Sequence, residues 1–405
     1  MTVTIYPGSP AGSVAAPPSK SMAHRLLICA GLAVSEEYSA VRGVAPSEDV
    51  LATLDCLRAL GAKCRLDGDT AAVRGADVFA PPEGAALPCR ECGSTLRFFI
   101  PLALLSGRAL SMTGSETLLN RPLSVYRDTC QAQQLRLRST PEGLQVKGPI
   151  SPGEYRIPGD VSSQFVSGLL FALPLLGAES IIRLIPPVES RPYIDMTRSA
   201  LRAFGVTADW LDGTTLQIPG GQAYRPRETT VEGDWSNAAF FLALGGRVSV
   251  TGLDADSLQG DKVCVEYFKA LGTGTAEEID ISDCPDLGPI LFAYAAMHGG
   301  GTFTGTRRLR IKESDRGAAM REELGKFGVP VEIEENRIAV GSGLRSPTVP
   351  LDGHNDHRIV MALAVLCTRT GGIIRGAEAV NKSFPDFFER LKTINVGVKI
   401  DGMDQ

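Results

Sequence analysis

The chain has 405 residues, of which 43% are hydrophobic and 21% charged, so it is long enough for two domains of ordinary size and is not globally disordered. Its formal net charge of −5 disfavours a general binder of nucleic acid or anionic membranes. The first residues lack the pattern of a signal peptide, and no apolar run is long enough to span a membrane. We therefore expect a cytoplasmic protein in which any anion site is local.

Six apolar segments rich in small residues recur along the chain, and each opens with Ser, Asp or Asn. They cover residues 19–36, 94–107, 162–177, 236–246, 286–300 and 355–372. An opening residue of this kind accepts hydrogen bonds from free N–H groups in the first turn of a helix. Because the segments are apolar nearly all round, they predict buried helices. The run after each one predicts a strand, at residues 38–44, 109–114, 180–185, 247–252, 301–306 and 371–377.

A second pattern, an amphipathic helix that ends in glycine before a strand, alternates with the first. It is found at residues 57–64, 201–206, 268–272 and 324–329, with weaker copies near 125–137 and 387–398. The two patterns together predict six repeats of about 67 residues. A Pro- and charge-rich segment at 225–233 separates the third and fourth copies. We expect an N-terminal domain of residues 14–230 and a C-terminal domain of residues 1–13 and 231–405, with three repeats each.

Basic residues stand at the starts of several predicted buried helices, namely Lys20, Arg25, Arg97 and Arg358. Others lie in the connections between these segments: Arg121 in the loop after the second strand, Lys312 and Arg316 between the fifth and sixth copies, and Lys382 near the end of the sequence. A helix N-terminus already attracts anions, so a cation there is unfavourable unless an anion is bound. Two like charges about 4 Å apart cost on the order of 4 kcal/mol at an effective dielectric of 20, so neighbouring anions need many cations. An ordinary salt bridge remains the alternative for each cation alone, but their repetition favours a ligand site.

Several familiar sites are absent from the sequence. It has no P-loop, no dinucleotide-binding glycine motif after a strand and no nucleophile elbow, and its four histidines do not suggest a triad. His354 and His357 lack a third histidine for a metal site. Cys89 and Cys92 form a lone C-x-x-C, for which we expect neither a metal nor a disulfide.

The chain resembles the EPSP synthase (3-phosphoshikimate 1-carboxyvinyltransferase) family over its whole length. The resemblance rests on PSKSMAHR at 18–25, CGSTLRF at 92–98, NRP at 120–122, GDVSSQFVSGLL at 159–170, SRPYIDMT at 190–197, VEGDWSNAAFFLA at 231–243, CPDL at 284–287, RIKESDR at 310–316, NDHRIVMA at 355–362 and NKSFPDFF at 381–388. It implies a two-domain, inside-out, barrel-like α/β fold with three βαββαβ units in each domain. It also implies an interdomain cleft that closes when shikimate 3-phosphate binds.

The implied reaction transfers the enolpyruvyl group of phosphoenolpyruvate to the 5-hydroxyl of shikimate 3-phosphate by addition and elimination, with release of phosphate. The resemblance implies no metal or organic cofactor, and we expect a monomer that binds neither nucleic acid nor membrane. Two alternatives remain: an enolpyruvyl transferase that uses UDP-N-acetylglucosamine, in which a loop cysteine such as Cys89 or Cys92 would act, and a non-catalytic binder of phosphorylated ligands.

The resemblance also assigns the site residues. Shikimate 3-phosphate is expected to contact Ser21, Arg25, Ser162, Ser163, Gln164, Ser190, Tyr193, Asp286 and Lys312. Phosphoenolpyruvate is expected to contact Lys20, Gly93, Arg121, Gln164, Arg316, Arg358 and Lys382. Arg97 is expected to support the loop around Gly93.

Asp286 and Glu313 are implied as proton-transfer carboxylates, with Lys20 as their cationic partner. This suits a reaction in which an alcohol loses a proton and C3 of the enol gains one. Without the resemblance, Asp286 could be only a helix cap and Glu313 only an ion-pair partner. Ser94 stands where many family members have threonine. Arg308 replaces a contacting asparagine of some members and is not expected to contact substrate.

Overall fold

The computed structural model describes residues 1–274 and 278–401, and the chain forms two compact units. One, the continuous unit, is Lys20–Glu232; the other, the discontinuous unit, combines Met1–Ser19 with Gly233–Gln405. Each unit has its own hydrophobic core. Within the described residues, no helix combines the length and apolarity that crossing a membrane requires.

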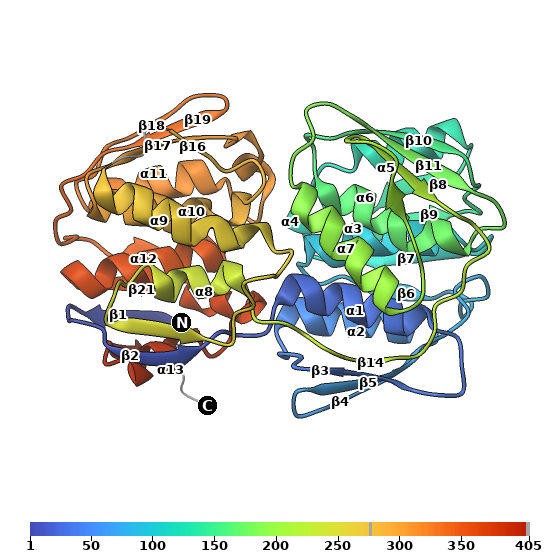
Figure 1. The fold of residues 1–405 in the computed structure, drawn as a ribbon, viewed down its shortest axis with the longest axis horizontal. Helices are drawn as coiled ribbons and strands as arrows, with labels where there is room; N and C mark the ends of the chain where they lie inside the picture. The colour runs from blue at the N-terminus through green and yellow to red at the C-terminus, as the bar shows by residue number, and fades with distance from the viewer. Residues whose placement is uncertain (275–277, 402–405) are drawn as a thin grey trace. The chain divides into compact units, whose positions relative to one another are not determined.

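The continuous unit contains three repeats, each with one four-stranded sheet (Figure 1). The first comprises α1 (Lys20–Leu32), β3 (Ser39–Arg42), α2 (Glu48–Ala59), β4 (Lys63–Asp67), β5 (Thr70–Arg74) and β14 (Glu228–Thr230). The second comprises β6 (Ala86–Pro88), α3 (Gly93–Ala103), β7 (Ala109–Thr113), α4 (Glu116–Leu119), α5 (Ser124–Ala132), β8 (Arg136–Thr140) and β9 (Gly143–Lys147). The third comprises β10 (Glu154–Pro158), α6 (Ser163–Ala172), the 3-10 helix η1 (Leu173–Leu175), β11 (Ser180–Ile185), α7 (Arg191–Ala203), β12 (Asp209–Trp210) and β13 (Thr215–Ile218).

The discontinuous unit contains the other three repeats. The fourth comprises β2 (Gly12–Ala15), α8 (Trp235–Leu242), β15 (Val248–Thr251), η2 (Gly260–Val263) and α9 (Cys264–Thr273). The fifth comprises β16 (Ile279–Asp280), η3 (Pro285–Leu287), α10 (Gly288–Met297), β17 (Gly301–Thr304), η4 (Arg307–Ile311), α11 (Arg316–Lys326), β18 (Val331–Ile333) and β19 (Arg337–Val340). The sixth comprises β20 (Leu351–Asp352), α12 (His357–Thr370), β21 (Gly372–Arg375), η5 (Ala377–Lys382), α13 (Phe387–Thr393), β22 (Gly397–Asp401) and β1 (Thr2–Tyr6).

The six predicted buried helices and the strands that follow them are confirmed as α1, α3, α6, α8, α10 and α12 with β3, β7, β11, β15, β17 and β21. The order within a complete repeat is β-α-β-α-β-β, so the implied order β-α-β-β-α-β is wrong. The two strands of a parallel pair need a crossover between them, and the first helix provides it in repeats such as β10–α6–β11. The second helix then leads into the antiparallel hairpin, as α7 leads into β12 and β13.

Two features depart from a regular sixfold repeat. Strand β1 replaces the last hairpin strand of the sixth repeat, because it pairs antiparallel with both β21 and β22. In the fourth repeat, β2 and β15 form a two-stranded sheet, and the described residues between α9 and β16 contain no hairpin. Figure 1 shows that the helices of each unit lie together inside it while most strands lie at its periphery.

The helix starts differ in detail from the predicted ones. Ser162 caps α6 as predicted, since its side chain accepts a hydrogen bond from Gln164 N. The N-cap of α3 is Cys92 rather than Ser94, and that of α8 is Asp234 rather than Ser236. Asp286 lies in η3, one turn before α10, so it does not cap that helix.

Candidate functional site

The two units each carry part of the predicted site, and each part is described within its own unit. In the discontinuous unit, one charged cluster joins the start of α12, the loop before α11 and η3. Asp286 lies 3.0 Å from Lys312 Nζ, 2.7 Å from Arg316 Nη1 and 3.8 Å from Arg358 Nη2. Glu313 accepts a hydrogen bond from Arg316 Nη2 at 2.7 Å. Five predicted site residues from three segments therefore lie together.

The electrostatics of this cluster favour ionised carboxylates. Burial alone raises the pKa of Asp286, but Lys312, Arg316 and Arg358 outweigh it and hold the pKa well below its ordinary value. Burial lowers the pKa of the Lys312 amine, although Asp286 opposes that shift. Burial also lowers the pKa of Arg316, but Asp356, Glu313 and Asp286 outweigh it and raise the pKa overall.

Arg358 is buried and incompletely partnered. Its Nε and Nη1 atoms have no hydrogen-bond partner among the described residues. Its backbone N–H donates to Asp356 Oδ1 at 2.9 Å, which fixes the start of α12. A buried guanidinium with unused donors is unfavourable unless an acceptor reaches it, so this position suits an anionic ligand. Lys382 contacts the same helix start, because its Nζ donates a hydrogen bond to Asn355 O at 2.7 Å.

In the continuous unit, Arg25 joins the start of α1 to α7. It donates from Nε to Thr197 Oγ1 at 2.8 Å, from Nη1 to Ser21 O at 2.6 Å and from Nη2 to Tyr193 O at 3.0 Å. Burial lowers its pKa to about 10, so the guanidinium remains charged at neutral pH. Two residues predicted for shikimate 3-phosphate, Ser21 and Tyr193, therefore lie around the Arg25 cation. Lys20 forms an ion pair with Asp49, with 2.7 Å between Nζ and Oδ2.

The starts of α3 and α6 form a second group in this unit. Gln164 accepts from Arg97 Nη1 at 2.7 Å and donates to Ser94 Oγ at 2.9 Å. Gly93 makes room for Arg121, because a Cβ at position 93 would lie 2.5 Å from Arg121 Nη1. The lack of a side chain at Gly93 is therefore what allows that guanidinium to approach the start of α3.

The other predicted residues of this unit lie at the starts of α6 and α7. Ser163 is buried at the first position of α6, after the Ser162 cap. Ser190 is buried in a left-handed conformation with φ 57°, directly before α7. Tyr193 lies in the first turn of α7. A common role of these side chains with the Gln164 group stays a prediction.

Sequence reasoning did not anticipate the partners that hold the cations. Asp356 lies at the opening of the sixth predicted helix, where the sequence indicates only a helix start. In the structure it binds Arg316 Nε at 2.9 Å and accepts a hydrogen bond from Ser314 Oγ at 3.0 Å. Asp49 forms an ion pair with Lys20, but its sequence position indicates only an ordinary acidic residue in the first turn of a helix. Only three-dimensional proximity identifies these two carboxylates.

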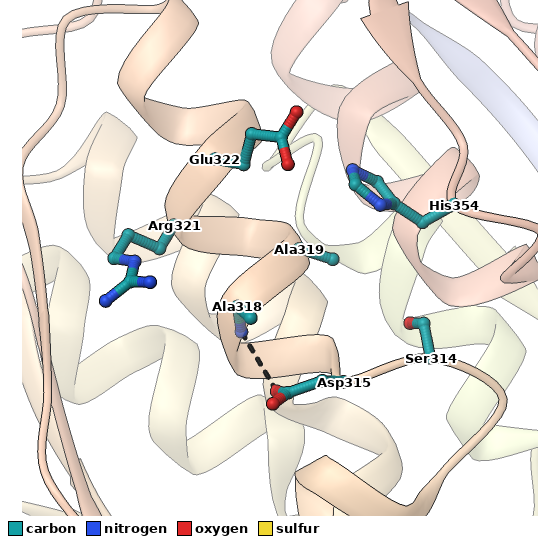
Figure 2. A pocket seen from close by; sticks show the side chains of 7 residues that line it. All are labelled: Ser314, Asp315, Ala318, Ala319, Arg321, Glu322 and His354. Carbon is teal, nitrogen blue, oxygen red and sulfur yellow. Dashed lines mark hydrogen bonds between the residues drawn. The ribbon is translucent and has the colours of Figure 1, made fainter.

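A surface hollow of about 500 Å³ lies on the discontinuous unit (Figure 2). Its lining comprises Ser314, Asp315, Ala318, Ala319, Arg321, Glu322 and His354. None of these residues belongs to the predicted site. The hollow is open and lies along α11, with its lining side chains on that helix and on the loop that carries His354.

The comparisons with known proteins identify the family. A family model described as EPSP synthase (3-phosphoshikimate 1-carboxyvinyltransferase) matches residues 7–391. The 3-phosphoshikimate 1-carboxyvinyltransferase of Clostridium kluyveri is 38% identical over 423 residues, covering 98% of both chains. That of Clostridioides difficile is 35% identical and covers 99% of this chain and 98% of its own.

A solved structure of EPSP synthase from Acinetobacter baumannii is similar over 98% of this chain and 100% of its own, with a TM-score of 0.77 and 25% identity. The two-domain inside-out α/β class is thereby confirmed, although the described strands form open sheets rather than a closed barrel. On its sequence and its fold, the chain belongs to the EPSP synthase (3-phosphoshikimate 1-carboxyvinyltransferase) family.

Proposed function

We propose that this protein transfers the enolpyruvyl group of phosphoenolpyruvate to the 5-hydroxyl of shikimate 3-phosphate and releases phosphate. The family supports this activity. The observation that carries it is the charged cluster of the discontinuous unit, in which buried Arg358 has unused donors beside the Asp286 carboxylate. The two compact units are the two domains in this proposal, with three repeats each. A monomeric state and a cytoplasmic location stay predictions.

Asp286 is the base for the 5-hydroxyl in this mechanism, and Glu313 transfers a proton at C3. A carboxylate whose pKa is held low by three cations is a weak base. When the anionic groups of the substrates bind Lys312 and Arg358, they offset those cations and raise the pKa of Asp286. The same anions therefore activate the base, and the cations then stabilise the charge on the departing phosphate.

Arg316 has a more restricted role than the other cations. Its Nε and Nη1 atoms each donate to one carboxylate and Nη2 donates to two, so only one N–H group, on Nη1, remains for phosphoenolpyruvate. We assign it chiefly to positioning Asp286 and Glu313. Phosphoenolpyruvate is then held by Lys20, Gly93, Arg121, Gln164, Arg358 and Lys382.

The continuous unit supplies most contacts to shikimate 3-phosphate in this proposal. Arg25 is already fixed by α7 and presents a permanent positive charge beside Ser21. The remaining contacts come from Ser162, Ser163, Gln164, Ser190 and Tyr193, with Asp286 and Lys312 from the other unit.

The alternative that uses UDP-N-acetylglucosamine is disfavoured by the cysteines as well as by the family. Cys89 and Cys92 are buried, and burial raises the pKa of Cys92 to about 12. A thiol of this kind is a poor acid–base group at neutral pH.

Phosphate release from phosphoenolpyruvate tests the proposal, with shikimate 3-phosphate present, omitted or replaced by UDP-N-acetylglucosamine. Release that requires shikimate 3-phosphate is the expected result. Release with the nucleotide sugar alone, or no release with either acceptor, would overturn it. The Asp286→Asn variant should lose about 100-fold or more in turnover. The matched Asp283→Asn variant changes an exposed carboxylate three residues earlier and should keep its turnover.

A further inference from the structure

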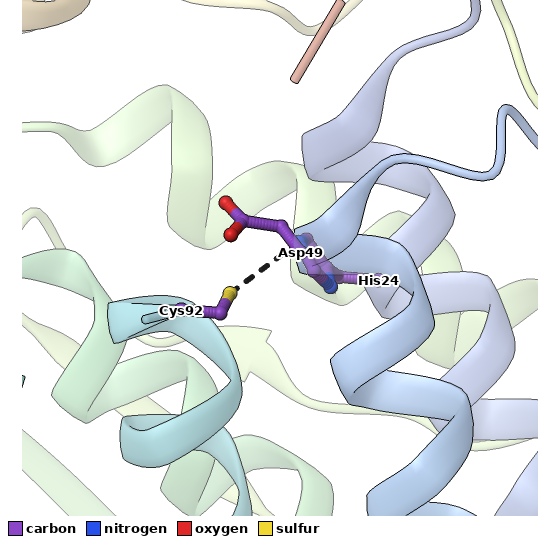
Figure 3. Close-up of side chains that lie close together, drawn as sticks. All are labelled: His24, Asp49 and Cys92. Atoms are coloured by element: carbon purple, nitrogen blue, oxygen red, sulfur yellow. Dashed lines mark hydrogen bonds between the residues drawn. The ribbon is translucent and has the colours of Figure 1, made fainter. Parts of the chain in front are cut away.

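Three helices of the continuous unit bring a nitrogen, an oxygen and a sulfur donor together (Figure 3). His24 comes from α1, Asp49 from α2, and Cys92 is the N-cap of α3. One donor atom from each lies within 4.8 Å of the other two, and 3.9 Å separates Cys92 Sγ from His24 Nε2. These residues are almost completely buried, with His24 1%, Asp49 8% and Cys92 2% exposed.

The surroundings orient the histidine. His24 Nδ1 lies 2.7 Å from Thr53 Oγ1, which lies 2.9 Å from Thr95 Oγ1. We assign the ring proton to Nδ1, which donates to Thr53, so that Nε2 directs its lone pair toward Cys92. An outer hydrogen bond on the other ring nitrogen is the usual support of a metal-binding histidine.

We propose that His24, Asp49 and Cys92 form an inhibitory binding site for a thiophilic divalent cation such as Zn²⁺. Imidazole, carboxylate and thiolate are the ligands that Zn²⁺ prefers, and three of them leave a fourth position open. The Cys92 thiol loses its proton to the solvent as the metal–sulfur bond forms. The C-x-x-C pattern does not reveal this site, because its ligands come from three helices and Cys89 is not one of them.

Lys20 links this site to activity. Its ammonium nitrogen lies 2.7 Å from Asp49 Oδ2, and both side chains are slightly exposed, at 15% for Lys20 and 11% for Asp49. A metal ion that binds Asp49 takes that carboxylate from Lys20 and repels the ammonium group. The inhibition therefore rests on the proposed role of Lys20 with phosphoenolpyruvate, whereas binding of the metal does not.

Titration of the full-length protein with Cd²⁺ tests the site without any assay of activity. Cadmium bound to a thiolate gives an ultraviolet charge-transfer absorption. We expect one such cadmium per chain, with its affinity lowered about tenfold or more in Cys92→Ser and His24→Gln. Serine keeps a side-chain oxygen that can cap α3, so Cys92→Ser should fold, and circular dichroism checks this.

Cys64→Ser is the matched control, since Cys64 is a partly exposed cysteine outside the cluster. It should bind cadmium as the unaltered protein does. An unchanged cadmium absorption in folded Cys92→Ser, or its loss in Cys64→Ser, would overturn the site.

Inhibition of phosphate release by Zn²⁺ then tests the consequence. We expect Cys92→Ser to need about tenfold more Zn²⁺ than the unaltered protein or Cys64→Ser for the same inhibition. Cadmium binding without inhibition of an active enzyme would overturn the inhibitory role. If the metal-free protein releases no phosphate but still binds cadmium, the proposed function would be overturned while the metal site would be supported.

Discussion

Arg316 shows how much a single residue contributes to the charged cluster of the discontinuous unit. Its side chain is 1% exposed and contacts three carboxylates, of which Asp356 is completely buried. An unpaired buried charge is strongly unfavourable, whereas a balanced buried pair is close to neutral. The arginine is therefore needed to hold the Asp286, Glu313 and Asp356 side chains close together.

The Arg316→Met variant should lose about 3–5 kcal/mol of unfolding free energy because the buried Asp356 carboxyl loses its cationic partner. Urea unfolding followed by circular dichroism measures this loss. Arg90→Met is the matched control, because Arg90 also binds two carboxylates, Glu48 and Asp55, but is 36% exposed. It should lose about 0–1 kcal/mol. Equal losses in the two variants would contradict the argument.

The sequence predicts the cations of the site better than the carboxylates that hold them. Lys20 and Arg358 stand out because a basic residue near the start of a buried helix lacks a structural reason. Asp49 and Asp356 do not stand out, because acidic residues are common in and before first helical turns. Their pairing with Lys20 and Arg316 depends on contacts between helices far apart in sequence. The catalytic roles themselves stay predictions.

At the scale of elements, α3 and α6 pack closely because Gly168 has no side chain. A Cβ at position 168 would lie 2.6 Å from Arg97 O in α3 and 2.3 Å from the Tyr126 hydroxyl. The same close approach places Gln164 of α6 beside Arg97 and Ser94 of α3. One glycine thus determines the spacing of two helix starts that carry predicted site residues.

Gly168→Ala should therefore destabilise the protein by about 1–3 kcal/mol, since either the backbone of α3 or Tyr126 must move. Gly325→Ala provides the control: Gly325 is also helical, in α11, but a Cβ there would meet nothing within 4 Å. That variant should gain up to about 1 kcal/mol from helix propensity alone. Thermal or urea unfolding measures the stability of both variants. An equal loss of stability in Gly325→Ala and Gly168→Ala would contradict the packing argument.

The loop before α12 contains a histidine that couples stability to pH. His354 Nε2 lies 2.9 Å from Oε1 of buried Glu323, and this hydrogen bond is the main reason that the pKa of His354 is raised. A raised pKa means that folding favours the protonated ring. The resulting stabilisation is complete below the unfolded pKa of about 6.5 and is lost as pH rises through the folded value.

Replacing His354 with Gln should consequently cost more unfolding free energy at about pH 6 than at about pH 9. Urea unfolding at both pH values measures the difference. His298 has the opposite shift, since burial and Arg369 lower its pKa. His298→Gln should therefore relieve a loss of stability at low pH instead. A His354→Gln effect independent of pH would exclude the ion pair as its cause.

At the scale of the whole molecule, the six helix–strand copies could be predicted because their apolar runs and glycine ends are strong local signals. The position of the hairpin strands within each repeat could not be predicted from such local signals. Strand β4, for example, has no fully buried residue, so its place depends on pairing with β5 rather than on its own pattern. The lack of a hairpin among the described residues between α9 and β16 also leaves no signal, because the second helix pattern of the fourth repeat is intact.

The two units should differ in their ability to fold from one continuous fragment. Residues 20–232 contain a complete core and all strands of three sheets. Residues 233–401 lack β1 and β2, and with them the buried Val3, Ile5 and Val14. We expect the first fragment to unfold cooperatively in urea and the second to do so only when residues 1–19 are joined to its C-terminus by a flexible linker. Cooperative unfolding of residues 233–405 alone would contradict this.

The position of β1 between β21 and β22 has a consequence for synthesis. Strand β1 leaves the ribosome before residues 20–232, but its partners β21 and β22 are synthesised only after them. The nascent N-terminal segment must wait while the whole of residues 20–232 emerges and becomes able to fold. The discontinuous unit completes this sheet only after β22 has emerged, so chaperones that shield nascent segments are needed for longest at β1.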